Sequence, residues 1–409
     1  MIQSFRIRLF PTPEQEEKLW EHVHAARKVW NWGLDYEMER FENGEKHLSA
    51  YSLKKVLTQA KKSEELKWLN NVSSQTLSVV LLDLGKAYDR FFSIKPARYT
   101  KAKKTKAART GRKLTHYELE GHPKFKSKKD NEHKFPIRYD HTYFIGGHVN
   151  IEKIGKIPYQ SDTGLPEGKE ACTVTNPRIK RAGEKWILSF GIERDNQAAG
   201  NRSDLTNKSL GIDLGIKTTA TASFGGEKVE FPNINKSGRV RKLERKLKHA
   251  QRNLSRKYKT NNKRDPNNKY EQTNNAKKIK FLKQKIESKL SNIRKDYTHK
   301  TTYKLISLLP KRVVMEDLSV KNMMKNRHLA KAIADQGWGE FIRQMEYKCE
   351  WYGIEFIQAG RFYPSSKKCS RCGAVKKDLK LKDRVYRCNE CGYEIERDYN
   401  AALNLERYG

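Results

Sequence analysis

Four cysteines near the carboxyl end of the chain have the spacing of a metal site. Cys369 and Cys372 form one C-x-x-C pair, and Cys388 and Cys391 form a second pair after fifteen intervening residues. Two such pairs close one tetrahedral zinc site, and four thiolates leave no coordination position open for a substrate. We therefore expect a structural Zn²⁺ here. A redox pair is the weaker alternative because the two pairs are matched.

Three carboxylates distant along the chain are candidates for phosphodiester chemistry. Asp213 and Glu316 each end an apolar run, and Asp398 stands just before an expected helix at 399–406. A carboxylate at the end of a buried strand is costly unless it is paired or metal-bound. Two Mg²⁺ ions about 3.5–4 Å apart stabilise both the attacking and the leaving oxygen of a phosphodiester. Three carboxylates that converge would suffice to hold such ions. Each alone fits an ordinary role equally well: helix cap for Asp398, ion-pair partner of a neighbouring lysine for Glu316 and turn acid for Asp213.

The segments around these acids predict a mixed α/β layer. Alternating apolar residues indicate strands, and apolar residues at spacings of three and four indicate helices. The expected strands are 209–213, 219–224, 228–231, 313–315 and 354–357, and the expected helix is 338–352, which Gly353 ends. Strand pairs followed by alternating helix and strand are typical of such a layer.

The first half of the chain has a different pattern. A short strand near 5–9 precedes helices marked by Leu19, Val23 and Val29 and by Leu77, Leu81 and Leu84. Residues 134–193 then change to short alternating runs separated by Gly and Pro, which predicts a small β domain. A polar, Ala- and Gly-containing stretch at 196–203 predicts a linker.

Positive charge is both large and concentrated. The 409 residues carry 85 Lys and Arg against 48 Asp and Glu, a formal net charge of +37. Segment 236–295 holds 22 Lys or Arg against 4 acids, and segment 95–139 holds 15 against 4. Apolar stripes at 240–254 and 279–293 make the first segment an expected antiparallel helical hairpin with basic outer faces. Such a surface needs an anionic partner, and nucleic acid fits better than a membrane because no strongly apolar helix face accompanies the charge.

The sequence predicts neither secretion nor a membrane span. The first ten residues alternate polar and apolar types without a secretory pattern, and the longest apolar run, 79–82, is far below the roughly 18 residues of a membrane span. Cys172 and Cys349 stand outside the quartet and are expected to be inert buried thiols of a protein in a reducing compartment.

The motifs taken together resemble the TnpB family, the RNA-guided nucleases that insertion sequences encode and that are regarded as ancestral to type V CRISPR effectors. The resemblance spans nearly the whole chain and is based on four specific motifs: the GIDLG run at 211–215, the EDLS run at 316–319, the cysteine quartet and the RDYNAA run at 397–402. Less specific motifs are RLFPTPEQ at 8–15 and PKFKSKK at 123–129. All three acids of the catalytic pattern are present.

The resemblance implies a multidomain α/β and β architecture. Its centre is a RuvC-like nuclease domain of ribonuclease H fold with a zinc-ribbon insertion, joined to a small β-barrel-like wedge domain and a helical recognition domain. The implied boundaries are 1–10 for the first wedge strand, 11–125 for the helical domain, 126–195 for the wedge and 196–207 for the linker. The nuclease domain consists of two stretches, 208–360 and 397–409, and the first of them contains the basic hairpin at 236–309. The zinc ribbon at 361–396 is inserted between the two stretches.

The resemblance also implies a function and partners. It describes an RNA-guided, Mg²⁺-dependent DNA endonuclease with two metal ions, for which Mn²⁺ can substitute, held by Asp213, Glu316 and Asp398. A guide RNA derived from the transposon end pairs with double-stranded target DNA beside a short transposon-adjacent motif. We expect a monomeric ribonucleoprotein in a prokaryotic cytoplasm, with no membrane. Two alternatives stay open: a guide-independent transposase that uses the same acids, and a catalytically silent RNA-guided repressor.

Direct nucleic-acid contacts are harder to assign from the sequence. Gln75 and Ser78 lie on a polar helix face, and Gln can pair bidentately with adenine, so this face is a candidate for reading a short motif. The same polar face has an ordinary explanation as a solvated cap. Lys124, Lys126 and Lys128 of the PKFKSKK run are further candidates for phosphate contacts.

Overall fold

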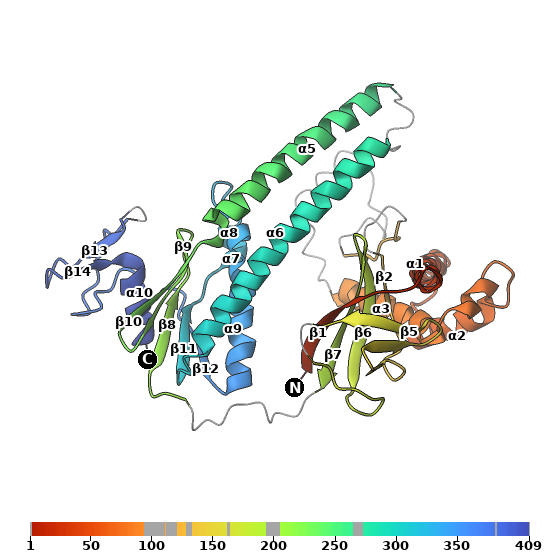
Figure 1. Cartoon of the computed structure of the whole chain (residues 1–409), viewed down its shortest axis with the longest axis horizontal. Coiled ribbons are helices and arrows are strands. Elements are labelled where there is room, and N and C mark those ends of the chain that lie inside the picture. Colours follow the sequence, from red (N-terminus) through yellow and green to blue (C-terminus); the bar gives the residue numbers. More distant parts are fainter. Residues whose placement is uncertain are drawn as a thin grey trace. The chain divides into compact units, whose positions relative to one another are not determined.

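The computed structural model describes residues 2–93, 111, 121–127, 133–161, 164–193, 205–264, 273–380 and 383–408. The chain divides into two compact units, Met1–Asp195 and Asn196–Gly409 (Figure 1). Most of the expected linker at 196–207 and most of the basic segment 95–139 lie outside the described residues. None of the described helices combines the length and the apolar character that a membrane crossing requires.

The first unit contains a seven-stranded antiparallel sheet in the order β2-β6-β7-β1-β5-β4-β3. Its strands are β1 (Ile2–Leu9), β2 (Lys134–Pro136), β3 (Tyr143–Ile145), β4 (His148–Ile151), β5 (Gly155–Gln160), β6 (Val174–Ala182) and β7 (Lys185–Glu193). Strand β1 lies in the middle and pairs with β5 on one side and β7 on the other. The expected alternation is confirmed in β1, where Phe5, Ile7 and Leu9 face the core.

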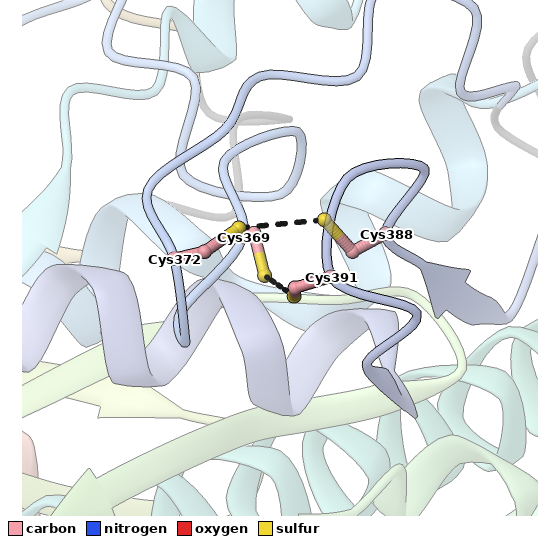
Figure 2. Close-up of side chains that lie close together, drawn as sticks. All are labelled: Cys369, Cys372, Cys388 and Cys391. Atoms are coloured by element: carbon pink, nitrogen blue, oxygen red, sulfur yellow. Dashed lines mark hydrogen bonds between the residues drawn. The ribbon is translucent and has the colours of Figure 1, made fainter.

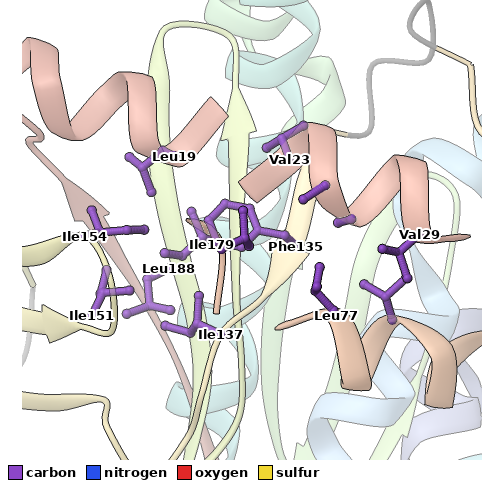
Figure 3. Close-up of a cluster of buried hydrophobic side chains, with 14 of the residues drawn as sticks. Leu19, Val23, Val29, Leu77, Phe135, Ile137, Ile151, Ile154, Ile179 and Leu188 are labelled. Carbon is purple, nitrogen blue, oxygen red and sulfur yellow. The ribbon is translucent and has the colours of Figure 1, made fainter. Parts of the chain in front are cut away.

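Helices cover this sheet and share its core. They are α1 (Pro13–Glu42), α2 (Ala50–Ala60), a 3₁₀ turn η1 (Lys67–Asn71) and α3 (Ser74–Ser93). Helix α1 begins at a capping box, in which the Thr12 side chain accepts from the Gln15 backbone and the Gln15 side chain accepts from the Thr12 backbone. Leu19, Val23 and Val29 of α1 and Leu77 of α3 then pack with sheet residues in one cluster (Figure 3). The helices and the sheet therefore form one body with a continuous core.

The second unit is built on a five-stranded mixed sheet in the order β10-β9-β8-β11-β12. Its strands are β8 (Ser209–Asp213), β9 (Thr218–Phe224), β10 (Glu227–Pro232), β11 (Arg312–Glu316) and β12 (Glu355–Ala359). Strands β8, β9 and β10 form an antiparallel meander, whereas β11 runs parallel to both β8 and β12. The expected mixed layer is confirmed, and the parallel strands all end at the same edge of the sheet.

Helices lie on both faces of this sheet. They are α5 (Gly238–Arg264), α6 (Asn274–Ile306), α7 (Val320–Met323), α8 (Ala330–Gln336), α9 (Trp338–Tyr352) and α10 (Arg397–Glu406). On one face, Ile212 and Met315 pack with residues of α6 and α9, such as Leu305 and Phe341. On the other face, Val314 packs with Leu405 of α10. A short two-stranded sheet, β13 (Val385–Arg387) with β14 (Glu394–Glu396), belongs to the cysteine-containing segment.

The expected basic hairpin is confirmed as helices α5 and α6 (Figure 1). Val240 of α5 packs against Ile286 and Leu290 of α6, so the narrow apolar stripes meet each other. Residues 265–272, between the two helices, lie outside the described residues. The two helices place their Lys and Arg side chains outward because the stripe is too narrow to bury more of the helix surface.

A buried lysine joins α6 to α9 beneath the sheet. Lys348 is 7% exposed and donates to the carbonyl of His299 (3.1 Å) and to the hydroxyl of Thr302 (2.7 Å). Thr302 in turn donates to the fully buried Gln344 (3.0 Å). Burial lowers the pKa of Lys348 to about 8 because its ammonium has no bonded carboxylate in this pocket to offset the lost hydration. The two cysteines outside the quartet were both expected to be buried. Cys349 is fully buried, which confirms the expectation, but Cys172 is half-exposed, so the expectation was wrong for that residue.

Replacing Lys348 with Met should stabilise the second unit in a pH-dependent way. The pKa of Lys348 falls from its ordinary 10.5 to about 8 on folding, so the unfolded chain binds more protons between these values and stability rises with pH there. At pH 7 the Lys348→Met variant should gain about 1–3 kcal/mol, since no charge is buried. The gain should shrink by pH 10. Thermal unfolding of both proteins at pH 7 and pH 10 measures this, and an identical difference at the two pH values would contradict it.

Candidate catalytic and metal sites

Two of the three expected acids lie at the ends of adjacent parallel strands. Asp213 is the last residue of β8 and Glu316 is the last residue of β11. The register pairs Met315 with Ile212, so the two acids occupy the next position on each strand. Because side chains alternate along a strand, both carboxylates leave the face that holds Ile212 and Met315 and lie on the face that α10 covers.

The third acid reaches the same place because a glycine lets α10 touch the sheet. A Cβ atom on Gly211 would lie 2.2 Å from the carbonyl oxygen of Ala402 and from the amide nitrogen of Glu406. Only glycine permits this backbone contact. Asp398 precedes Ala402 by one helical turn and therefore shares its face of α10. The helix begins at Arg397, so Asp398 lies in its first turn and not before it.

The electrostatics show that these acids are neighbours. The pKa of Asp213 is raised well above its usual range, first by burial and then by the negative charges of Glu316 and Asp398. The positive charge of Arg397 opposes this rise but does not cancel it. Asp213 therefore lies where an ionised carboxylate is unstable unless a further positive charge is present.

The other two acids have protein partners that hold their orientation. The Ser365 hydroxyl donates to Glu316. Asp398 is 7% exposed and pairs with Arg397, with 3.0 Å between the guanidinium and the carboxylate. Asp398 does not cap α10, whose N-cap residue is Glu396, and Glu316 does not need a lysine partner. The carboxylates are neighbours, but across the described residues only the cysteine quartet draws three or more ligand atoms close enough to share one ion.

The three acids suit a hard divalent cation. Each offers carboxylate oxygens, which Mg²⁺ and similar ions prefer. Burial first, and then the charges of Glu316 and Asp398, raise the pKa of Asp213 more than Arg397 lowers it. A divalent cation would supply the missing positive charge, so the donor chemistry and the electrostatics agree.

The four cysteines converge as their spacing predicted (Figure 2). Their sulfur atoms all lie within 4.8 Å of one another. Each pair turns as a knuckle: the Gly373 amide donates to the Cys369 carbonyl (2.9 Å), and the Gly392 amide donates to the Cys388 carbonyl (3.2 Å). Both glycines have positive φ, at 79° and 65°. The backbone N–H of Cys391 helps to lower the pKa of Cys388 to about 6, whereas the neighbouring thiols help to raise the pKa of Cys372 to about 12, so the four sulfurs ionise as one set. This set fits a closed tetrahedral zinc site.

Two asparagines of α10 connect the cysteine segment to the acids. Asn400 accepts from the Ser370 amide (3.0 Å) and donates to the Lys368 carbonyl (2.7 Å). Asn404, one turn later, donates to the carbonyls of Ser365 (2.8 Å) and Lys368 (2.6 Å). The backbone that carries Ser365 and Cys369 is therefore fixed to the helix that carries Asp398. The sequence analysis did not identify these residues, although the i, i+4 spacing of two asparagines beside an acid is a signal for a shared polar face.

The expected nucleic-acid contacts lie in the first unit. Gln75 is half-buried at the start of α3, whereas Ser78 is 8% exposed and donates to the Ser74 carbonyl (2.8 Å). The Lys124 carbonyl accepts from the Trp30 indole (3.0 Å), and the Lys126 ammonium lies 3.6 Å from the centre of the Trp30 ring. Lys128 lies outside the described residues. Lys124 and Lys126 therefore lie on an exposed segment that contacts Trp30 of α1. The Ser78 hydroxyl is bonded to the backbone of its own helix.

Three stretches of the chain match known protein families, and together they include residues of both units. Residues 189–327 match a family described as "Probable transposase", and residues 338–405 match the "Cas12f1-like, TNB domain". Residues 1–46 match a "Helix-turn-helix domain", although in this chain they contain β1 and the single 30-residue helix α1. The match at 338–405 covers α9, β12, the cysteine quartet and most of α10.

Individual relatives match over the full length. A protein of Streptomyces pristinaespiralis named "Putative RNA-guided DNA endonuclease" is 32% identical over 98% of this chain and 88% of its own length. A similarly named protein of Escherichia coli strain K12 is 28% identical over 99% of this chain and 91% of its own length. The solved structure titled "Cryo-EM structure of the Cas12f1-sgRNA-target DNA complex" has the same fold, with a TM-score of 0.56 at 14% identity over 99% of this chain and 98% of that one.

The fold and the cysteine quartet define a protein with a set of ligands that could hold a metal ion and with three acids grouped at one edge of a mixed sheet. By its identity to the Streptomyces protein over nearly the whole chain, it belongs to the TnpB family.

Replacing Gly211 with Ala should displace α10 and disturb the acids. The added Cβ meets backbone atoms at 2.2 Å, so the helix must shift, at a cost of about 1–3 kcal/mol. Gly339→Ala is the control, since nothing lies within 4 Å of its Cβ position. We expect thermal unfolding to show a lower melting temperature for Gly211→Ala only. Equal melting temperatures of the two variants would contradict the role given to Gly211.

Replacing Cys388 with Ser should remove the bound zinc. One lost thiolate breaks the closed site, and binding free energy of the metal is folding free energy for such a unit. We expect about one zinc per chain in the parent protein, a large loss in the variant, and faster proteolysis of the carboxyl-terminal segment. Cys349→Ser is the control, because that thiol is buried in a different core. Full zinc content in Cys388→Ser, measured by atomic emission, would refute the assignment.

Proposed function

We propose that this protein is an RNA-guided DNA endonuclease that hydrolyses phosphodiester bonds at Asp213, Glu316 and Asp398. The observation that carries the proposal is the position of Asp213 and Glu316 at the ends of adjacent parallel strands, beside the helix that bears Asp398 and contacts Gly211. The raised pKa of Asp213 agrees with it. The relatives from Streptomyces and Escherichia coli support the guide-dependent reaction, because both are named as RNA-guided DNA endonucleases.

The proposed nuclease domain is RuvC-like, with a ribonuclease H fold. Support comes from the strand order β10-β9-β8-β11-β12, in which an antiparallel meander continues into parallel strands. We propose boundaries of 208–360 and 397–409 for this domain and 361–396 for the inserted zinc ribbon. For the first unit we propose strand 1–10 and residues 126–195 as the barrel-like wedge, and 11–125 as the helical recognition domain.

The chain's own residues prepare the site for catalysis. Ser365 fixes the orientation of Glu316, and Arg397 holds Asp398. Asp213, between them, is poised to become fully ionised when positive charge enters. Bound Mg²⁺, for which Mn²⁺ substitutes, supplies that charge and stabilises the charge developing on a phosphodiester during hydrolysis, which two ions do most effectively.

The basic surface supports nucleic acid as the substrate and as the guide. A groove of about 830 Å³ beside the helical hairpin is lined by residues of three helices. Its cations, Arg241, Arg245, Lys248, Arg294 and Lys331, outnumber its acids, Glu244 and Asp335. Such cations contact phosphates without reading sequence, which leaves recognition to base pairing. We propose a monomeric complex with a transposon-end guide RNA that cuts double-stranded DNA beside a short motif, in a prokaryotic cytoplasm. Gln75, Lys124, Lys126 and Lys128 are proposed nucleic-acid contacts, with Ser78 supporting the helix.

Replacing Asp213 with Ala tests the function. We expect the purified complex with its copurifying RNA to cut a matched DNA in Mg²⁺, and the variant to lose at least about 1,000-fold in rate, because the metal-binding acids act as a unit. RNA content and target binding should stay near those of the parent. Asp296→Ala is the control, since Asp296 is an exposed acid of α6 that pairs with Lys300 (2.9 Å) and has no part in the acidic site.

The outcomes separate the proposal from its rivals. Unchanged cleavage by Asp213→Ala would refute the assigned site. Cleavage of the same DNA by protein freed of RNA would indicate a guide-independent transposase instead. Target binding without cutting by the parent protein would indicate an RNA-guided repressor.

A further inference from the structure

Phe362 is the most exposed of the large hydrophobic side chains described, at 94% exposure. A phenylalanine in water forgoes about 1.5–3 kcal/mol of burial free energy, so a ligand that covers this ring would gain binding free energy of that order. The residue lies in the segment that leaves β12 and enters the cysteine-containing unit.

The segment around Phe362 is held firmly on both sides. Arg361, just before it, forms two hydrogen bonds with Asp317, at 2.8 and 3.1 Å. Tyr363, just after it, donates its amide to the Gly360 carbonyl (2.8 Å) and its hydroxyl to the Asn404 carbonyl (3.1 Å). Its ring also packs edge-on against Tyr408, with 4.8 Å between ring centres. Phe362 is therefore presented by an ordered turn whose neighbours are all occupied with other contacts.

The turn lies at the edge of the sheet where the acids are. Ala359, the last residue of β12, pairs with Glu316, so β12 ends beside this acid. Phe362 comes three residues after Ala359. Ser365, three residues after Phe362, donates to Glu316, and three residues span at most about 10 Å. In sheets of this kind ligands bind at the carboxyl ends of parallel strands.

The surroundings favour nucleic acid over a protein as the occupant. Lys367 and Lys368 follow Phe362 within the same short segment, and the whole chain carries a net charge of +37. A lone aromatic ring among cations is the pattern of single-stranded nucleic-acid sites, where bases stack on the ring and phosphates contact the cations. A protein interface would need a wider apolar patch.

We propose that Phe362 is a positioning residue that stacks on a nucleobase of single-stranded DNA beside the bond to be cut. The stacked base fixes the strand, so that the neighbouring phosphate lies at Asp213, Glu316 and Asp398. This inference rests on the proposed function, since it takes the acids as the place of cleavage.

Two measurements on the full-length complex test the stacking. The first is single-turnover cleavage of each DNA strand in Mg²⁺ by the parent protein and by Phe362→Ala, Phe362→Leu and Phe362→Trp. The second is the fluorescence of 2-aminopurine placed at single positions of single-stranded DNA, which stacking quenches. Tyr303→Ala is the control for lost exposed aromatic surface, because Tyr303 is 61% exposed on α6, which packs on the opposite face of the sheet from α10.

Stacking on a base is worth about 1–3 kcal/mol, so Ala and Leu should each slow cleavage by roughly 5- to 150-fold, whereas Trp should restore the rate. Quenching at one or two positions should disappear with Ala and Leu and persist with Trp and with Tyr303→Ala. Full activity of Phe362→Ala, rescue by Leu, or a change of oligomeric state in Phe362→Ala would overturn the inference. If the parent protein fails to cut, the proposed function fails, and the quenching measurement still decides whether Phe362 stacks on a base.

Discussion

The central constraint in this protein is the concentration of negative charge at one edge of a mixed sheet. Asp213 is buried beside Glu316 and Asp398, and the pKa of Asp213 is raised because an ionised carboxylate there is poorly solvated and repelled by its neighbours. A fold that only needed stability would place an apolar residue at this position. The free-energy cost of the arrangement is therefore best explained by a function that requires positively charged ligands.

Much of the surrounding structure maintains that arrangement. Gly211 allows the backbone of α10 to contact β8, and this contact brings Asp398 to the strand ends. Asn400 and Asn404 then attach the cysteine-containing segment to the same helix. The cysteine-containing segment and the acidic site are thus mechanically connected. Asn404 of α10 fixes the backbone of Ser365, and the Ser365 hydroxyl donates to Glu316.

The sequence predicted those features that depend on local pattern and fixed spacing. The strand at 209–213, the helix at 338–352 and the basic hairpin follow from apolar periodicity, and the cysteine quartet follows from the matched pairs. The seven-stranded order of the first unit could not be predicted, because β1 pairs with β5 and β7 more than 140 residues later. Ser365, Asn400 and Asn404 were also missed, since serine and asparagine are common in turns and helices and acquire meaning only when folding brings their partners near. The start of α10 was misplaced by two residues, which moved Asp398 from the flank of the helix into its first turn.

The most direct test of the central claim is to locate divalent cations in crystals of the complex grown or soaked with Mn²⁺, using its anomalous scattering. The account predicts one or two Mn²⁺ peaks within coordination distance of Asp213, Glu316 and Asp398 together. Peaks elsewhere on the protein, with these carboxylates bound only to Ser365, Arg397 and water, would contradict it.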